Sequence, residues 1–258
     1  MKTRVKFLKN IKLRNPVLFT GLPGIGLVGK ISVDYLLKQL KAQKIAEVFS
    51  DSFPPSIHTK DGVINMIKDE IFLYSFKDRD YLFLAGPVQP ALDIRSSSMA
   101  EHYEFAEAIM DSLKAKGLKE VYTLAGINIG EKRMLSEPNV IIAATDKNIL
   151  AEWKKFGAVG DRPEGLISGA AGLILGVAKE NGISGACLMG ETNARLVYGD
   201  HGAAKNVLEL LIKKYGFKVD MSRIEKEAKE IESAFTQLAK QFEDQEEKPA
   251  EHGLSYVR

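Results

Sequence analysis

A glycine-rich turn carries the residues of this sequence whose spacing best suits chemistry. It follows the short apolar run Val17–Thr20, and its segment Gly24–Gly29 fits the pattern G-x-G-x-x-G. That pattern, with an acidic residue such as Glu47 downstream, is typical of a dinucleotide-binding turn between a strand and a helix. With Lys30 added, the segment also fits G-x-x-x-x-G-K, the start of a phosphate-binding loop.

Neither nucleotide interpretation fits the whole turn. Ile31 stands where a phosphate-binding loop needs a magnesium-binding hydroxyl, and Pro23 has no N–H to offer to a phosphate. The turn is also unusually apolar for a phosphate site. We therefore favour a structural glycine turn, in which the absence of side chains lets the start of a helix pack closely against neighbouring elements or another subunit. Its residues are Gly21, Pro23, Gly24, Gly26 and Gly29. A nucleotide- or nucleoside-binding α/β enzyme that uses Gly24–Gly29 remains the alternative.

Other polar residues give weaker signals, and we predict no catalytic residue and no metal site. The four histidines are scattered, and Glu101, His102 and Glu104 point in different directions on a helix. Cys187 lies in an apolar run, which favours a buried and inert thiol. Ser168 lacks the G-x-S-x-G context of a nucleophile.

Residues near the ends of two predicted elements are better placed. Asp200 precedes a helix and is predicted to cap it rather than to act with His201. Glu191 and Thr192 follow a strand, the position at which α/β domains bind ligands, and are the best candidates for a small-molecule site.

Strands and helices alternate along the chain and must position these residues. The pattern predicts a three-layer α/β domain with a largely parallel or mixed sheet. The runs flanking Lys68-Asp69-Glu70 predict a hairpin with a polar turn. Predicted strands are Val17–Thr20, Ile45–Phe49, Val63–Ile67, Ile71–Phe76, Tyr81–Ala85, Val121–Ala125, Val140–Ala144 and Gly185–Met189. Predicted helices are Leu27–Gln43, Ser96–Lys116, Asn148–Phe156, Gly169–Lys179 and Ala203–Tyr215.

Composition limits the class of protein. The 258 residues are 45% hydrophobic and 27% charged, with a net charge of +2 and one cysteine, so we expect a globular cytoplasmic protein without disulfides or cofactors. We expect no nucleic-acid partner, no membrane span and no secretory signal. Residues 2–14 hold six basic and no acidic side chains, which predicts an edge strand with a solvated basic face.

The C-terminal part has a narrow apolar stripe at a/d spacing. We predict that this stripe packs against a helix of another copy, with packing onto the chain's own domain as the alternative. The predicted organisation is a core domain at 1–219, a packing helix at 220–243 and an acidic tether with a hydrophobic-aromatic tip at 244–258. The stripe consists of Ile224, Ala228, Ile231, Phe235, Leu238 and Phe242.

The tip contains Leu254, Tyr256, Val257 and the carboxylate of Arg258. An apolar and aromatic tip on an acidic tether is typical of a short docking peptide, because Tyr supplies contact area at low entropic cost and a free carboxylate can be captured by a lysine. A frayed terminus, or one that packs on its own core, is the alternative.

The chain resembles the proteasome-assembly-chaperone family, in its archaeal branch, over about residues 17–235. The motifs are Gly21–Gly29, Phe53-Pro54-Pro55, Ile167-Ser168-Gly169 with Gly172–Leu175, Leu188–Thr192, Asp200 before Ala203-Ala204, and Val219-Asp220. The resemblance implies a fold of the nucleoside-phosphorylase type without enzyme activity. It also implies a homo-oligomeric chaperone that binds proteasome α-subunits. Family relatives end in a hydrophobic-Tyr-any tail, whereas Tyr256 here is third from the end.

Overall fold

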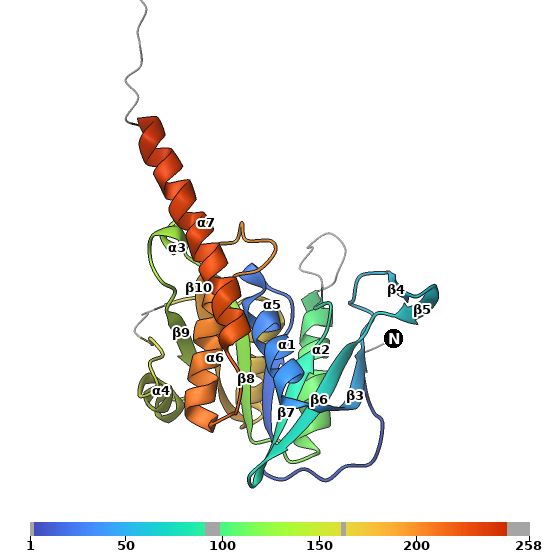
Figure 1. Ribbon diagram of the computed structural model, residues 1–258. Coiled ribbons are helices and arrows are strands. Elements are labelled where there is room, and N and C mark those ends of the chain that lie inside the picture. The colour runs from blue at the N-terminus through green and yellow to red at the C-terminus, as the bar shows by residue number, and fades with distance from the viewer. Residues whose placement is uncertain (1–2, 91–98, 161–163, 247–258) are drawn as a thin grey trace, which may run out of the picture.

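The computed structural model describes residues 3–90, 99–160 and 164–246. Within them, eight strands form one mixed sheet that lies between two layers of helices (Figure 1), which confirms the predicted three-layer α/β fold. The central strands β7, β2, β8 and β10 run parallel, and the outer pairings are antiparallel. In spatial order the strands are β1 (Arg4–Phe7), β3 (Gln43–Phe49), β6 (Asp69–Phe76), β7 (Arg79–Ala85), β2 (Val17–Gly21), β8 (Glu120–Asn128), β10 (Ser184–Thr192) and β9 (Val140–Ala144).

Helices cover both faces of the sheet. On one face lie α1 (Val28–Leu40), α4 (Lys147–Lys154) and α6 (His201–Tyr215), with α7 (Ser222–Glu246) packed on α6. On the other face lie α2 (Met99–Lys114) and α5 (Gly169–Glu180). Two short helices, η1 (Ile25–Leu27) and α3 (Lys132–Leu135), stand in loops that follow β2 and β8.

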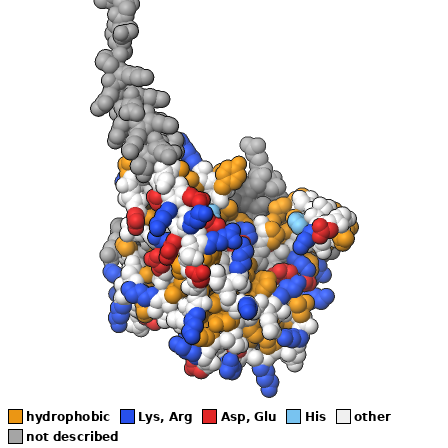
Figure 2. Space-filling model, viewed as in Figure 1, with side chains coloured by type: hydrophobic (Ala, Val, Ile, Leu, Met, Phe, Trp, Pro, Cys, Tyr) orange, Lys and Arg blue, Asp and Glu red, His pale blue; other side chains and the backbone are white. Residues whose placement is uncertain are grey.

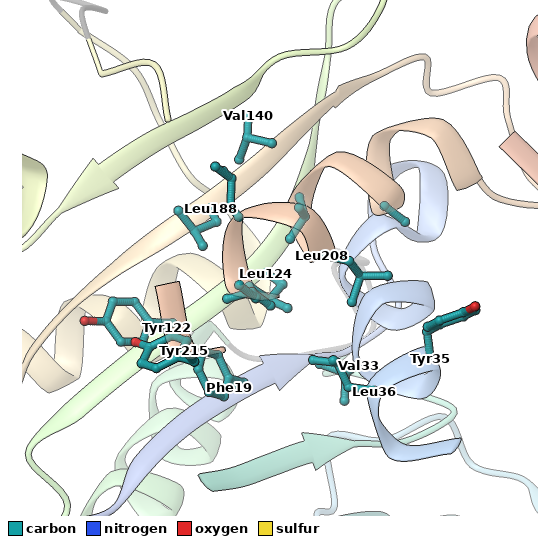
Figure 3. Packing of buried hydrophobic residues seen from close by; sticks show 14 of the residues in the cluster. Phe19, Val33, Tyr35, Leu36, Tyr122, Leu124, Val140, Leu188, Leu208 and Tyr215 are labelled. Atoms are coloured by element: carbon teal, nitrogen blue, oxygen red, sulfur yellow. The ribbon is translucent and has the colours of Figure 1, made fainter. Parts of the chain in front are cut away.

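The central strand β2 is buried along its whole length, as expected for a parallel strand covered on both faces. Its Phe19 stacks on Phe83 and Tyr122, with ring centroids 5.6 and 5.7 Å away, and meets the edge of Tyr215 on α6 at 5.4 Å. Figure 3 shows Phe19, Tyr122 and Tyr215 converging between the sheet and the helices. This aromatic cluster fixes α6 on the sheet.

One predicted pairing is wrong. Residues 63–66 do not pair with Ile71–Phe76 across Lys68-Asp69-Glu70. They form β5 (Val63–Met66), which pairs with β4 (Ile57–Lys60) around a turn at Asp61-Gly62. Asp61 and Gly62 both have positive φ, as a two-residue primed hairpin turn requires. β6 then pairs with β7, so the segment 68–70 leads into a strand of the main sheet and is not a turn.

The basic N-terminal segment forms the predicted edge strand. β1 is the last strand on one side of the sheet, with Arg4 and Lys6 exposed and Val5 and Phe7 half-buried. The charged face of β1 therefore points to water, as its alternating sequence indicated.

The C-terminal helix α7 is packed on its own chain along its first half. Ile224, Ala228 and Phe235 are buried, and α7 contacts α6 and α3. This differs from the inter-subunit contact that the sequence predicted for these three residues. The physical reason is that α6 and α3 offer the stripe an apolar partner within the chain. Past Phe235 the helix runs out beyond the body of the domain (Figure 1) and continues to Glu246, slightly beyond the predicted boundary at 243.

Candidate functional site

The glycine turn lies at the carboxyl ends of the parallel strands β2, β8 and β10. Gly21 ends β2, η1 follows, and α1 begins at Val28. Gly26 has φ 59° and Leu27 has φ 49°, so the chain passes through two left-handed residues just before the helix. Glycine adopts that conformation without steric cost, which explains Gly26.

Three glycines of the turn are required by close packing. A Cβ on Gly29 would lie 2.0 Å from the carbonyl oxygen of Leu124 on β8, and one on Gly21 would lie 2.4 Å from the carbonyl oxygen of Gly29. A Cβ on Gly26 would lie 2.4 Å from Oγ1 of Thr192. Around Gly24 there is open space among the described residues. The turn is thus pressed against β8 and β10, as the structural interpretation expects, except at Gly24.

The residues that a nucleotide would need are used elsewhere. Nζ of Lys30 donates to Oδ2 of Asp34 at 2.8 Å and to the carbonyl oxygen of Gly86 at 3.3 Å. Glu47 lies on β3, three strands from β2, which is about 14 Å at the usual strand spacing. There it pairs with Lys68 and Lys44, which lower its pKa even though burial raises it. The geometry fits neither the dinucleotide nor the phosphate-loop interpretation.

A mainly apolar cavity of about 390 Å³ opens beside the turn. It lies between the turn, the end of β8 and the start of α5. At its mouth Leu166 is 97% exposed and Ile25 is 45% exposed, so two large apolar side chains face water there. Its remaining apolar lining includes Leu22, Leu124, Ile127, Ile167 and Met189.

Behind the turn, polar groups connect Gly26 to the cap of α6. The backbone N–H of Asp200 donates to the carbonyl oxygen of Gly26 at 2.8 Å, and Oγ1 of Thr192 donates to Oδ2 of Asp200 at 2.9 Å. Oδ1 of Asp200 accepts from the N–H of Ala203 at 2.9 Å, which confirms the predicted N-cap. His201 faces Glu227 of α7 at 3.5 Å.

Arg133 of α3 joins this network and is fully buried. Its Nε and Nη2 donate to Oδ2 and Oδ1 of Asp200 at 2.8 and 3.0 Å. Nη1 and Nη2 also donate to Glu232 of α7, and the guanidinium lies 5.2 Å from the ring centroid of Phe235. Burial alone would lower the pKa of Arg133, but the bonds to Asp200 and Glu232 raise it overall. We call Thr192, Asp200, Arg133 and Glu232 the latch, because they connect the glycine turn to α7.

The latch contains residues that the sequence did not single out. Arg133 stands in a short polar helix, and Glu232 stands on a charged flank of the apolar stripe. No local pattern distinguishes them from solvated side chains, although an aspartate that caps a helix in an otherwise apolar environment does call for a cationic partner.

The other candidate residues are separated from one another. Glu191 accepts from the N–H and from Nδ2 of Asn139, both at 3.0 Å, whereas Thr192 is buried in the latch, so the predicted pair does not form one site. Cys187 is buried as predicted, and burial raises its pKa to about 12. Ser168 precedes α5 without a side-chain capping bond to the described part of the chain.

Two searches concern only residues 3–90, 99–160 and 164–246. No cluster of His, Cys, Asp or Glu side chains there is arranged to hold a metal ion. Neither is any helix there both long and apolar enough to cross a membrane. The predicted tip residues Leu254, Tyr256, Val257 and Arg258 lie outside the described residues, as do the side chains of Leu238 and Phe242.

The fold and the glycine turn together define a three-layer α/β domain whose signature glycines serve packing. The chain belongs to the PAC2 family, whose model matches residues 18–239. This confirms the resemblance drawn from the sequence motifs.

Several relatives match over nearly their whole length. The uncharacterised protein MJ1210 of Methanocaldococcus jannaschii is 34% identical over 265 residues, covering 100% of this chain and 98% of the relative. The crystal structure of Pyrococcus furiosus PbaB, described as an archaeal proteasome activator, superposes with a TM-score of 0.81 at 30% identity, covering 92% of this chain and 99% of PbaB. P. furiosus PbaA, described as an archaeal homolog of proteasome-assembly chaperone, gives 0.71 at 25% identity, with 95% of each chain covered.

Proposed function

We propose that this protein is a homo-oligomeric proteasome assembly chaperone or proteasome-docking factor of the cytoplasm, and that it binds proteasome α-subunits through its C-terminal tail. Membership of the PAC2 family and the likeness to PbaB and PbaA support the connection to the proteasome. The proposal includes no catalytic step, because the glycine turn is occupied by packing contacts.

The observation that carries the proposal is the course of α7. Its first half is held on the body by the latch and by the buried Ile224, Ala228 and Phe235. Beyond Phe235 the helix extends by about 16 Å at the usual rise per residue, away from the rest of the domain (Figure 1). A helix anchored at one end and free at the other is suited to presenting the segment that follows it to a partner.

The chemistry of that segment fits a groove between protein subunits. Leu254, Tyr256 and Val257 supply apolar area, and the carboxylate of Arg258 supplies a charge that a lysine can bind. One such tip binds weakly. Several tips on one oligomer raise the effective concentration, and avidity can then gain about 10²–10⁴-fold if the spacing of the tips matches the partner.

The test compares the binding of four chains to archaeal proteasome α-subunit rings, measured by analytical ultracentrifugation at low salt. The chains are the full sequence, a chain ending at Glu246, Tyr256→Ala and Ser255→Ala. We expect the full chain and Ser255→Ala to co-sediment with the rings, and the truncated chain and Tyr256→Ala to lose most of the binding. If the full chain does not bind, the proposal is wrong. Binding that survives truncation would place the contact on the body.

A further inference from the structure

The β4–β5 hairpin stands apart from the main sheet and has one apolar face. In its register Ile57 lies opposite Met66, and Thr59 lies opposite Ile64, so these four side chains share a face. Ile57, Ile64 and Met66 are 52%, 67% and 66% exposed. An isolated two-stranded hairpin is marginal in water, and soluble proteins seldom leave apolar strands uncovered.

The apolar face continues into a groove. Ile57 and Met66 line a hollow of about 500 Å³ together with Phe53, Pro54 and Pro55. Figure 2 shows hydrophobic side chains along this side of the molecule, next to the hairpin. We call Phe53–Pro55, Ile57, Ile64 and Met66 the hairpin surface.

A second uncovered apolar surface surrounds the cavity at the glycine turn. Leu166 and Ile25 project at its mouth. An apolar cavity of about 150 Å³ can hold a benzene-sized group, so about 390 Å³ has room for more than one aliphatic side chain. We call Ile25, Leu166 and this cavity the turn surface.

We propose that the hairpin surface of one copy of this chain docks on the turn surface of the next copy. Each chain carries both surfaces on different elements, and within the described residues neither covers the other. One repeated head-to-tail contact between copies therefore buries both, and contacts of this kind close into rings. The exposed charges agree, because Lys60 lies on the hairpin and Glu164 lies beside Leu166.

This inference deepens the self-association included in the proposed function, and its test uses the chain alone. A failed contact between copies therefore leaves the proteasome experiment to be decided separately. The native Cys187 is fully buried, so engineered surface cysteines can be cross-linked against a silent background.

The test is disulfide formation in the full chain carrying Ile64→Cys and Leu166→Cys. We expect mild oxidation to give a ladder of covalent dimers, trimers and larger species on a non-reducing gel. The matched control pairs Leu166→Cys with Asn65→Cys, which is exposed between Ile64 and Met66 but on the opposite face of the hairpin. We expect that control to stay almost entirely monomeric on the gel.

Three outcomes would overturn the proposal. One is a ladder of equal strength from the Asn65→Cys control. Another is a covalent dimer from Ile64→Cys alone, which would mean that two hairpins meet each other. The third is a monomeric mass for the unmodified chain by light scattering. As a second measurement, Ile64→Glu should abolish the oligomer in light scattering while Asn65→Glu retains it, with unchanged circular dichroism for both.

Discussion

Arg133 and Asp200 face each other through two parallel hydrogen bonds, 2.8 and 3.0 Å long, and both side chains are fully buried. Arg133 follows β8 in the chain, and Asp200 caps α6. A buried ion pair adds little stability compared with apolar groups of the same shape, but removal of one partner leaves an unpaired charge. The pair therefore admits one arrangement of α3 and α6, and through Glu232 one position of α7.

We expect Asp200→Asn to destabilise the fold by about 3–5 kcal/mol, because Arg133 loses its main counter-charge while it stays buried. Asn is as good an N-cap as Asp, so the loss reports the ion pair and not the cap. The measurement is urea unfolding followed by circular dichroism.

The control for this variant is Asp146→Asn. Asp146 is an exposed N-cap of α4 that accepts from the N–H groups of Asn148 and Ile149. We expect a change within about 0.5 kcal/mol. Equal losses in the two variants would show that capping, rather than the buried pair with Arg133, accounts for the role of Asp200.

Sequence patterns predicted the layers of this fold because its central strands are continuous apolar runs. Val17–Thr20 and Val140–Ala144 could be identified because buried strands covered on both faces need apolar residues throughout. The run that starts at Val63 was assigned to the wrong partner strand because the polar segment 68–70 resembled a turn. A stronger turn signal, the Asp61-Gly62 pair, directly precedes that run and pairs it with β4 instead.

The site could be predicted only in part. The close packing of the glycine turn and the cap at Asp200 follow from local chemistry. The latch does not, because Arg133 and Glu232 become partners only when α7 folds back onto α3 and α6. The same tertiary contact explains why a stripe as narrow as a coiled-coil seam is buried within one chain: the charged flank of the stripe is satisfied by an arginine from another element.

The position of α7 gives a second prediction. Glu232→Gln removes the carboxylate that Arg133 contacts from α7. Because the Glu232 side chain is 37% exposed, we expect a cost of only about 1 kcal/mol. The clearer effect should be faster hydrogen exchange of the amides of α7, with little change in the central strands.

Glu230→Gln is the matched control for this variant. Glu230 lies two residues away and is exposed to solvent. We expect its α7 amides to exchange at the unmodified rate. If Glu230→Gln accelerates exchange as much as Glu232→Gln does, helix charge rather than the latch governs the anchoring of α7.

The glycine turn gives a third prediction, on two positions of the same motif. Gly29→Ala places a methyl group against the carbonyl oxygen of Leu124 and should destabilise the fold by about 1–3 kcal/mol. Gly24→Ala places its methyl group in open space and should change stability by no more than about 0.5 kcal/mol. Thermal unfolding of both variants tests this difference, and a larger loss at Gly24 would contradict the packing role of the turn.

A buried carboxyl group at the start of β6 makes stability depend on pH. Asp69 is fully buried, and neither of its oxygens has a well-formed hydrogen bond to the described residues. Burial raises the pKa of Asp69 well above its ordinary value, although the nearby N–H of Val88 and the charge of Lys30 offset part of the effect. The folded chain therefore holds this proton more tightly than the unfolded chain does.

The sign of the effect follows from that difference. The stability contributed by Asp69 is complete below its unfolded pKa near 3.8 and is lost as pH rises from there through the folded pKa. The loss is about 1.4 kcal/mol for each pH unit that separates the folded pKa from the unfolded pKa. Asp80 should act in the opposite sense. Burial raises its pKa, but bonds from Ser75 and Arg14 lower it overall, so its contribution is lost as pH falls.

We therefore expect Asp69→Asn to raise stability at neutral pH and to flatten the decline that the unmodified chain shows from about pH 4 upward. Asp80→Asn should lower stability at neutral pH and weaken the loss in acid, because it removes a carboxylate bonded to Ser75 and Arg14. Urea midpoints measured across this pH range test both variants. A steeper decline in Asp69→Asn than in the unmodified chain would mean that Asp69 is ionised and paired in the folded state, and the assignment of a proton to this buried group would be wrong.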